Sequence, residues 1–242
     1  MFRLLSLAVI LIAVPQLALA QDVTLSLGDD SSLATRSIQL LVLVTVLSIV
    51  PGIAVTITCF PFIVTVLSIL RQALGLQQSP PNMLIVSLAL FLTYFVMEPV
   101  FMQSWTTGVQ PYVAGEVELE QAFATTIEPF RAFMANRVDP DTFNHLRELR
   151  ADISESTDIS DQSPLSLLIP SFLLSEIERA FQVGFLIFLP FLIIDLVVSA
   201  ILMSMGMMMV PPAIVSLPFK LAFFVVSDGW ALVSSALVRS YF

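Results

Sequence analysis

The sequence predicts an all-α, membrane-associated protein in which two helical hairpins, built from Pro- and Gly-interrupted helices, flank an acidic, helical extracytoplasmic region. Of its 242 residues, 57% are hydrophobic and only 12% are charged, whereas a soluble domain carries about 25% charged residues. The mean hydropathy is +0.93. Many of the fifteen prolines lie inside apolar stretches, which indicates interrupted helices rather than smooth membrane spans.

Residues 1–20 have the pattern of a cleavable signal peptide. Residues 4–14 form a short apolar core, and Ala18 and Ala20 supply the small side chains that a signal peptidase requires at positions −3 and −1. The alternative is an uncleaved anchor, but an apolar core of eleven residues falls short of the ~20 that a membrane span requires. We expect cleavage after Ala20, followed by a polar N-terminal tail over residues 21–36.

Residues 37–109 are predicted to form the first apolar hairpin. The 34 positions between Arg36 and Arg71 contain no charge, and a continuous helix of that length would be about 51 Å long, against a hydrocarbon thickness of ~30 Å. We therefore expect this limb to be broken, with residues 82–101 forming the second limb. The candidate breaks are Pro51, Gly52 and Pro61.

Residues 110–164 are predicted to be an acidic periplasmic region. Eleven acidic and four basic residues lie between Glu116 and Asp161. Pro140 follows Asp139 and is placed to open a helix around residues 143–149.

Residues 165–242 are predicted to form a second hairpin with limbs at about 172–205 and 212–238. The turn between them is rich in methionine, an unbranched and flexible side chain that conforms to irregular surfaces. Gly206 would let this loop bend, and a proline pair would prevent the next helix from absorbing it. A glycine followed by a proline pair also occurs at the tip of the first hairpin. The second loop contains Gly206, Met207, Met208 and Met209, and its proline pair is Pro211 and Pro212.

A few charged residues lie in apolar surroundings, where an unpaired charge is costly. We expect Asp195 and Lys220 each to find an opposite charge, a polar helix end or water; a proton relay is the alternative. Glu176, Glu178 and Arg179 are expected at the start of a helix, where the two acids suit the helix dipole, or in salt bridges between subunits. The candidate buried or inter-subunit charges are Arg71, Glu176, Glu178, Arg179, Asp195, Lys220 and Asp228.

Several function classes are disfavoured by composition. The formal net charge of −9 and the lack of a basic block disfavour nucleic-acid binding. A metal site with several imidazoles is excluded because His145 is the only histidine, and we interpret it as a solvated residue. Cys59 lies in an apolar stretch and is interpreted as packed rather than nucleophilic. The sequence has no Gly-rich phosphate-binding loop, so we expect no enzyme activity and no cofactor.

A set of short motifs in both apolar halves matches one known family. These motifs are LRQALG at 70–75, PPN at 80–82, LALFLT at 88–93, IPSFLLSE at 169–176, AFQVGF at 180–185, LPFLIID at 189–195, MSMGMMMVPP at 203–212, SLPFK at 216–220 and DGW at 228–230. With them the chain resembles the FliP family of flagellar biosynthetic proteins. The resemblance extends from about residue 38 to the C-terminus and includes the cleavable signal. The chain departs from the family at 58–63, TCFPFI, where the family usually has an arginine.

This resemblance implies a pore-forming core subunit of the flagellar type III protein export gate in the bacterial inner membrane. Five copies would form a ring with FliQ and FliR at the flagellar basal body, mostly on the periplasmic side. The ring would act with FlhA and FlhB and pass unfolded flagellar substrates, while residues 207–209 would form a methionine gasket. The alternatives are a homologous injectisome gate subunit, and a stand-alone secondary transporter or ion channel that uses Asp195 for coupling.

Overall fold

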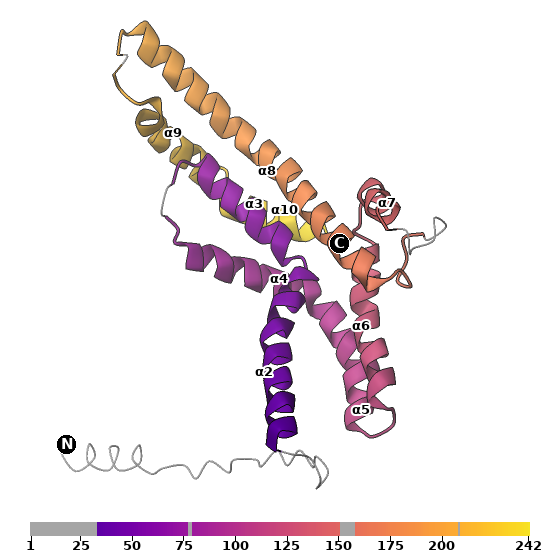
Figure 1. The fold of residues 1–242 in the computed structure, drawn as a ribbon. Helices are drawn as coiled ribbons and strands as arrows, with labels where there is room; N and C mark the ends of the chain where they lie inside the picture. The colour runs from indigo at the N-terminus through magenta and orange to yellow at the C-terminus, as the bar shows by residue number, and fades with distance from the viewer. Residues whose placement is uncertain (1–32, 77–78, 151–157, 208) are drawn as a thin grey trace, which may run out of the picture. The chain divides into compact units, whose positions relative to one another are not determined.

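The computed structural model describes residues 33–76, 79–150, 158–207 and 209–242, and within these ranges every regular element is a helix (Figure 1). The predicted signal peptide lies outside the described residues. The chain divides into two compact units, residues 1–47 and 48–242. The helices are α2 (Leu33–Thr56), α3 (Phe60–Ala73), α4 (Asn82–Ser104), the π-helix η1 (Trp105–Val109), α5 (Gln110–Val113), α6 (Leu119–Ala135), α7 (Pro140–Glu148), α8 (Leu165–Ser204), α9 (Pro212–Val226) and α10 (Gly229–Arg239).

The predicted break at Pro51 and Gly52 is wrong, because α2 continues through both residues to Thr56. An internal proline removes one backbone hydrogen bond and can kink a helix without ending it. The break falls instead between α2 and α3, and Pro61 lies in the first turn of α3. The first N–H groups of a helix have no partner within the helix, so a proline at this position costs no helical hydrogen bond.

Both hairpin tips end their first helix in the same way. Gly75 and Gly206 have left-handed φ angles of +79° and +75°. The N–H of the residue after each glycine donates to a carbonyl five residues earlier, to Arg71 at 3.3 Å in the first tip and to Leu202 at 3.0 Å in the second. This is the Schellman arrangement, in which a left-handed glycine satisfies the last carbonyls of a helix.

The second hairpin differs from the prediction in both limbs. Its first limb, α8, is one 40-residue helix that begins at Leu165 and contains two internal prolines. Its second limb is two helices, α9 and α10, which are bent by 62°. Asp228 lies at the bend with φ +50°, a left-handed conformation that Asp tolerates better than most residues. Gly229 follows because a Cβ there would come within 2.2 Å of the Phe224 ring.

The main hydrophobic core lies where α3 packs along α8, with α4, α9 and α10 adding to it. One face of α3 is buried at helical spacing, from Phe62 and Ile63 through Val66 to Leu70. A second cluster joins α6 and α7 to the start of α8 around Met134, and includes Phe143, Leu168 and Phe172.

The acidic region begins with a close helix pair, in which α6 packs against α4 and η1. The Ser104 hydroxyl donates to the Thr126 carbonyl at 2.7 Å. A Cβ on Gly108 would lie 2.7 Å from the Thr126 backbone, so only glycine fits at this crossing. The predicted helix at Pro140 is present as α7, which Asp139 caps through the Thr142 N–H at 3.0 Å.

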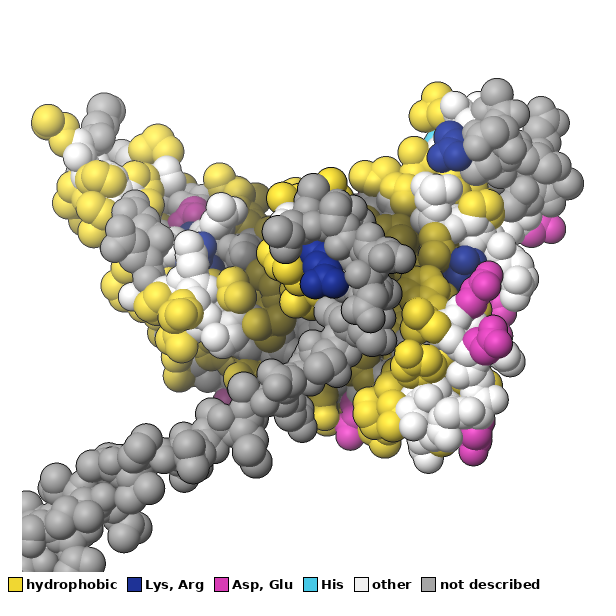
Figure 2. Space-filling view, turned by 60° about the horizontal axis from the view of Figure 1, so that its bottom comes forward, with side chains coloured by type: hydrophobic (Ala, Val, Ile, Leu, Met, Phe, Trp, Pro, Cys, Tyr) yellow, Lys and Arg dark blue, Asp and Glu magenta, His cyan; other side chains and the backbone are white. Residues whose placement is uncertain are grey.

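Three described helical segments are long and apolar enough to cross a membrane, namely Arg36–Thr56, Asn82–Val113 and Leu165–Ser204. The bent α9–α10 pair would make a fourth. Large apolar side chains are exposed on all of them, and Figure 2 shows hydrophobic side chains over much of one face. Surfaces of this kind are typical of contact with lipid or with other protein chains.

Candidate functional site

The methionine loop lies at the tip of the second hairpin, between α8 and α9. Gly206 ends α8, and α9 begins at Pro212 directly after Pro211. The side chains of Met207 and Met209 are exposed, Met209 almost completely at 97%. Met208 lies outside the described residues.

Asp195 and Lys220 form an ion pair between α8 and α9. Lys220 Nζ lies 2.6 Å from Asp195 Oδ2, and the Ser216 hydroxyl donates to Asp195 Oδ1 at 2.6 Å. Lys220 Nζ also donates to the carbonyl of Ala73 at 3.0 Å. Since Ala73 is the last residue of α3, the ammonium group lies at the negative end of that helix dipole. We refer to these four residues as the Lys220 cluster.

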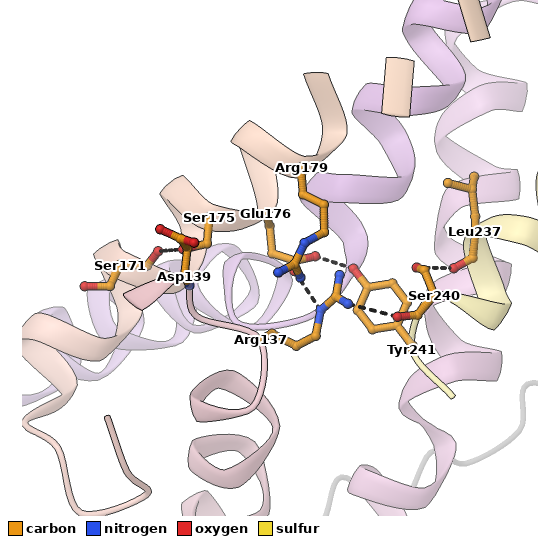
Figure 3. Close-up of polar contacts among 9 residues, drawn as sticks. All are labelled: Arg137, Asp139, Ser171, Ser175, Glu176, Arg179, Leu237, Ser240 and Tyr241. Carbon is orange, nitrogen blue, oxygen red and sulfur yellow. Dashed lines mark hydrogen bonds and ion pairs between the residues drawn. The ribbon is translucent and has the colours of Figure 1, made fainter. Parts of the chain in front are cut away.

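A second polar cluster surrounds Glu176, whose carboxylate is completely buried (Figure 3). Arg137 Nε donates to Glu176 Oε1 at 3.0 Å, and Arg179 Nη1 lies 3.5 Å from the same oxygen. The Tyr241 hydroxyl donates to the other carboxylate oxygen. A buried carboxylate requires such partners because its desolvation is costly. We refer to these four residues as the Glu176 cluster.

Arg137 links the acidic region to the C-terminal segment as well as to α8. Its guanidinium donates to the Ser240 carbonyl at 2.9 Å and stacks 4.1 Å from the centroid of the Tyr241 ring. Next to it, the Asp139 N–H donates to the Ser175 hydroxyl at 2.9 Å, as Figure 3 shows. Three segments far apart in the sequence therefore meet at Glu176.

The expectation that residues 176–179 open a helix is wrong, because α8 begins at Leu165, about three turns earlier. The hydroxyl of Ser175, which a helix start at this point would use as a cap, donates instead to the Ser171 carbonyl one turn earlier in α8. Glu178 is exposed and accepts a hydrogen bond from Gln182 at 3.1 Å. Asp228 is also exposed.

Arg71 closes the tip of the first hairpin. Its guanidinium donates to the Pro80 carbonyl at 3.4 Å and to the Asn82 side chain. These contacts are within the chain and connect the end of α3 to the start of α4. A contact of Arg71 with another subunit stays a prediction.

Cys59 and His145 occupy very different environments. Burial raises the pKa of the Cys59 thiol to about 12, so the reactive thiolate is scarce. His145 is exposed on α7. Within the described residues, no group of three or more His, Cys, Asp or Glu side chains could hold a metal ion.

Sequence reasoning missed Arg137 and Tyr241 as partners of Glu176. They lie 39 and 65 residues from it, beyond the range of any helical periodicity. Burial, followed by the Glu176 carboxylate, raises the pKa of the Tyr241 phenol, which therefore stays protonated as a donor. Ser216 was also missed, although its position four residues before Lys220 on the same helix offered a local signal.

Comparisons with a family model and with individual relatives point to the same protein family. Residues 43–237 match the family model described as the FliP family. The chain is 48% identical over 228 residues to the flagellar biosynthetic protein FliP of Caulobacter vibrioides, covering 94% of this chain and 85% of that protein. It is 45% identical to the FliP protein of Agrobacterium fabrum over the full length of both chains. Identity to the Bacillus subtilis FliP protein is 41%, over 88% of this chain and 96% of the relative.

Proposed function

Because the chain belongs to the FliP family of flagellar biosynthetic proteins, we propose that it is a pore-forming core subunit of the flagellar type III protein export gate. Five copies would assemble with FliQ and FliR in the inner membrane and pass unfolded flagellar substrates supplied by the apparatus that includes FlhA and FlhB. Family membership carries this proposal. The family role in flagellar biosynthesis and export is structural rather than catalytic.

The length of α8 supports an assembled ring rather than a simple membrane span. Its 40 residues give a length of about 60 Å, roughly twice the hydrocarbon thickness of a bilayer. About half of this helix would have to lie outside the lipid, yet apolar side chains such as Phe181 and Phe185 are exposed along it. Packing against other subunits would cover this surface.

The buried charges fit the same arrangement. Glu176 and Lys220 are both satisfied within the chain, so neither requires a water-filled lumen or a bound ion. The surface left to contact neighbouring subunits is then mainly apolar, as in the cores of stable interfaces.

The methionine loop is the proposed seal. Five loops meeting on the ring axis would close a narrow apolar constriction, which blocks ions because water is unstable in it. Flexible thioether side chains could then conform to an unfolded chain of any sequence as it passes.

The alternatives are less well supported. For a stand-alone transporter or channel, Asp195 would be the coupling group, but its two oxygens are already engaged by Lys220 and Ser216. The relatives reported above are all named as flagellar proteins, which favours the flagellar role over an injectisome role.

Native mass spectrometry of the detergent-extracted complex tests the proposal. We expect a species with five copies of this chain together with FliQ and FliR. A monomer or dimer that remains intact at micromolar concentration would contradict the proposed gate and favour a transporter.

A further inference from the structure

We propose that the Lys220 cluster is the pivot of the gate, and that the hairpin tip beyond it is the part that moves when the gate opens. The hairpin tip is defined as residues 196–207 and 209–215, which lie beyond Asp195 on α8 and before Ser216 on α9. This inference rests on the proposed export function and assigns positioning roles to Asp195 and Lys220 within it.

The Lys220 cluster connects three helices at one point. Lys220 on α9 reaches Asp195 on α8 at 2.6 Å and the Ala73 carbonyl at the end of α3 at 3.0 Å. Lys220 is buried, so its contact with the Ala73 carbonyl is shielded from competing water. The Asp195 side chain is 34% exposed, so the ion pair itself is only partly shielded. Since α3 packs along α8 in the main core, Lys220 fixes α9 to the most firmly packed part of the molecule.

The hairpin tip lacks comparable links. Among its described residues, no hydrogen bond or ion pair joins α8 to α9; the Ser204 hydroxyl, for example, donates to Ile201 on its own helix. On α9 the first buried residue is Ser216. Only apolar contacts therefore hold the two limbs together beyond the pivot.

An apolar groove runs between the limbs from the pivot into the hairpin tip. Its volume is about 400 Å³, and residues on both sides of the pivot line it, including Ile194 and Phe219 on the core side and Val197, Ile201 and Val215 in the tip. The limbs do not interdigitate fully where the groove lies, so they lose dispersion contacts that a filled interface would make. A segment with few such contacts opens at lower free energy than the core does.

A small rotation at the pivot would displace the methionine loop by a distance comparable to a side chain. From Asp195 to the end of α8 at Ser204 is nine residues, or about 14 Å. A rotation of about 20° at the pivot would shift the methionine loop by about 5 Å, roughly the width of a side chain. The groove provides space for the limbs to approach each other during this rotation.

Two kinds of variant in the full export complex test the pivot. Lys220→Met keeps the aliphatic stem but removes both polar contacts, and Lys220→Arg is the matched conservative change. Val215→Phe partly fills the groove and leaves the ion pair intact. Three quantities are measured for each variant: the amount of assembled complex, the ion conductance without substrate and the rate of flagellar substrate export. The conductance and the export rate are both expressed per assembled complex.

We expect Lys220→Met to raise conductance several-fold because the closed position of the tip is no longer fixed, and Lys220→Arg to restore most of the seal. Val215→Phe should slow export several-fold at unchanged conductance, since the limbs can no longer approach. The pivot is refuted if Lys220→Met changes only the yield of complex, or if Val215→Phe exports normally. Export that continues when the wild-type gene is deleted would refute the proposed function itself, which is a separate outcome.

Discussion

Replacing Arg137 with Met should strongly destabilise the chain, because it leaves the Glu176 carboxylate buried with too few partners. Glu176 has no exposed surface, and Arg137 Nε is its closest cationic contact at 3.0 Å. After the substitution only Arg179, at 3.5 Å, and the Tyr241 hydroxyl would remain. The hydrogen bond to the Ser240 carbonyl and the stacking on Tyr241 would also be lost.

The magnitude follows from these contacts. Breaking a buried ion pair by removing one partner costs about 3–5 kcal/mol. Loss of the hydrogen bond from Arg137 to the Ser240 carbonyl adds about 1 kcal/mol, while the remaining contact of Glu176 with Arg179 offsets part of the total. We expect a net loss of about 3–5 kcal/mol, which for a chain of this size corresponds to roughly 6–20 °C in the unfolding midpoint.

The assay is the thermal unfolding midpoint of the detergent-purified complex, together with the amount of complex recovered. Glu178→Gln is the matched control, because Glu178 is exposed on the same helix and should shift the midpoint little. Adding Glu176→Gln to Arg137→Met removes the unpaired charge and should recover part of the loss. A single Arg137→Met variant as stable as wild type, or a double variant less stable than the single one, would refute the reasoning.

Three further predictions concern packing, reactivity and processing. Gly108→Val should prevent recovery of folded complex, because even a Cβ at this position would lie 2.7 Å from the Thr126 backbone. The control is Gly52→Val, which should be recovered normally because a Cβ there meets nothing within 4 Å. Cys59 should resist a water-soluble maleimide in the native complex at pH 8 and react after denaturation, since burial raises its pKa to about 12; rapid native labelling would contradict this. N-terminal sequencing of the mature protein should begin at Gln21, and a sequence beginning at Met1 would show that the signal is retained.

The all-helical fold with long apolar helices was predictable because long apolar runs without charge have few other solutions in a membrane protein. The residues at which individual helices begin and end were not predictable. Pro51 was expected to break a helix, but proline is a local perturbation, and tertiary context decides whether a helix kinks or stops. The bend at Asp228 was missed because an isolated left-handed residue followed by glycine leaves no periodic signal.

The Lys220 cluster and the Glu176 cluster show more clearly which contacts the sequence could not predict. The sequence identified Asp195 and Lys220 as charges that require partners, since burying an unpaired charge is costly. It predicted Glu176 at a helix start or in a salt bridge between subunits. It could not supply all the partners, because Arg137 lies 39 residues from Glu176 and Ala73 lies 147 residues from Lys220. Such pairings depend on how helices pack, and one chain's periodicity does not encode that packing.

The central claim, that methionine loops seal a protein export pore, is tested most directly by ion conductance in cells that produce the gate with Met207, Met208 and Met209 all changed to Ala. Shorter side chains would leave a wider aperture while the α8 and α9 limbs remain. The account predicts a conductive gate without substrate, at normal amounts of assembled complex. Unchanged conductance at normal assembly would contradict the claim. A loss of assembly without conductance would also contradict it, because that result is expected of methionines packed in a core, where each truncation costs about 2–5 kcal/mol.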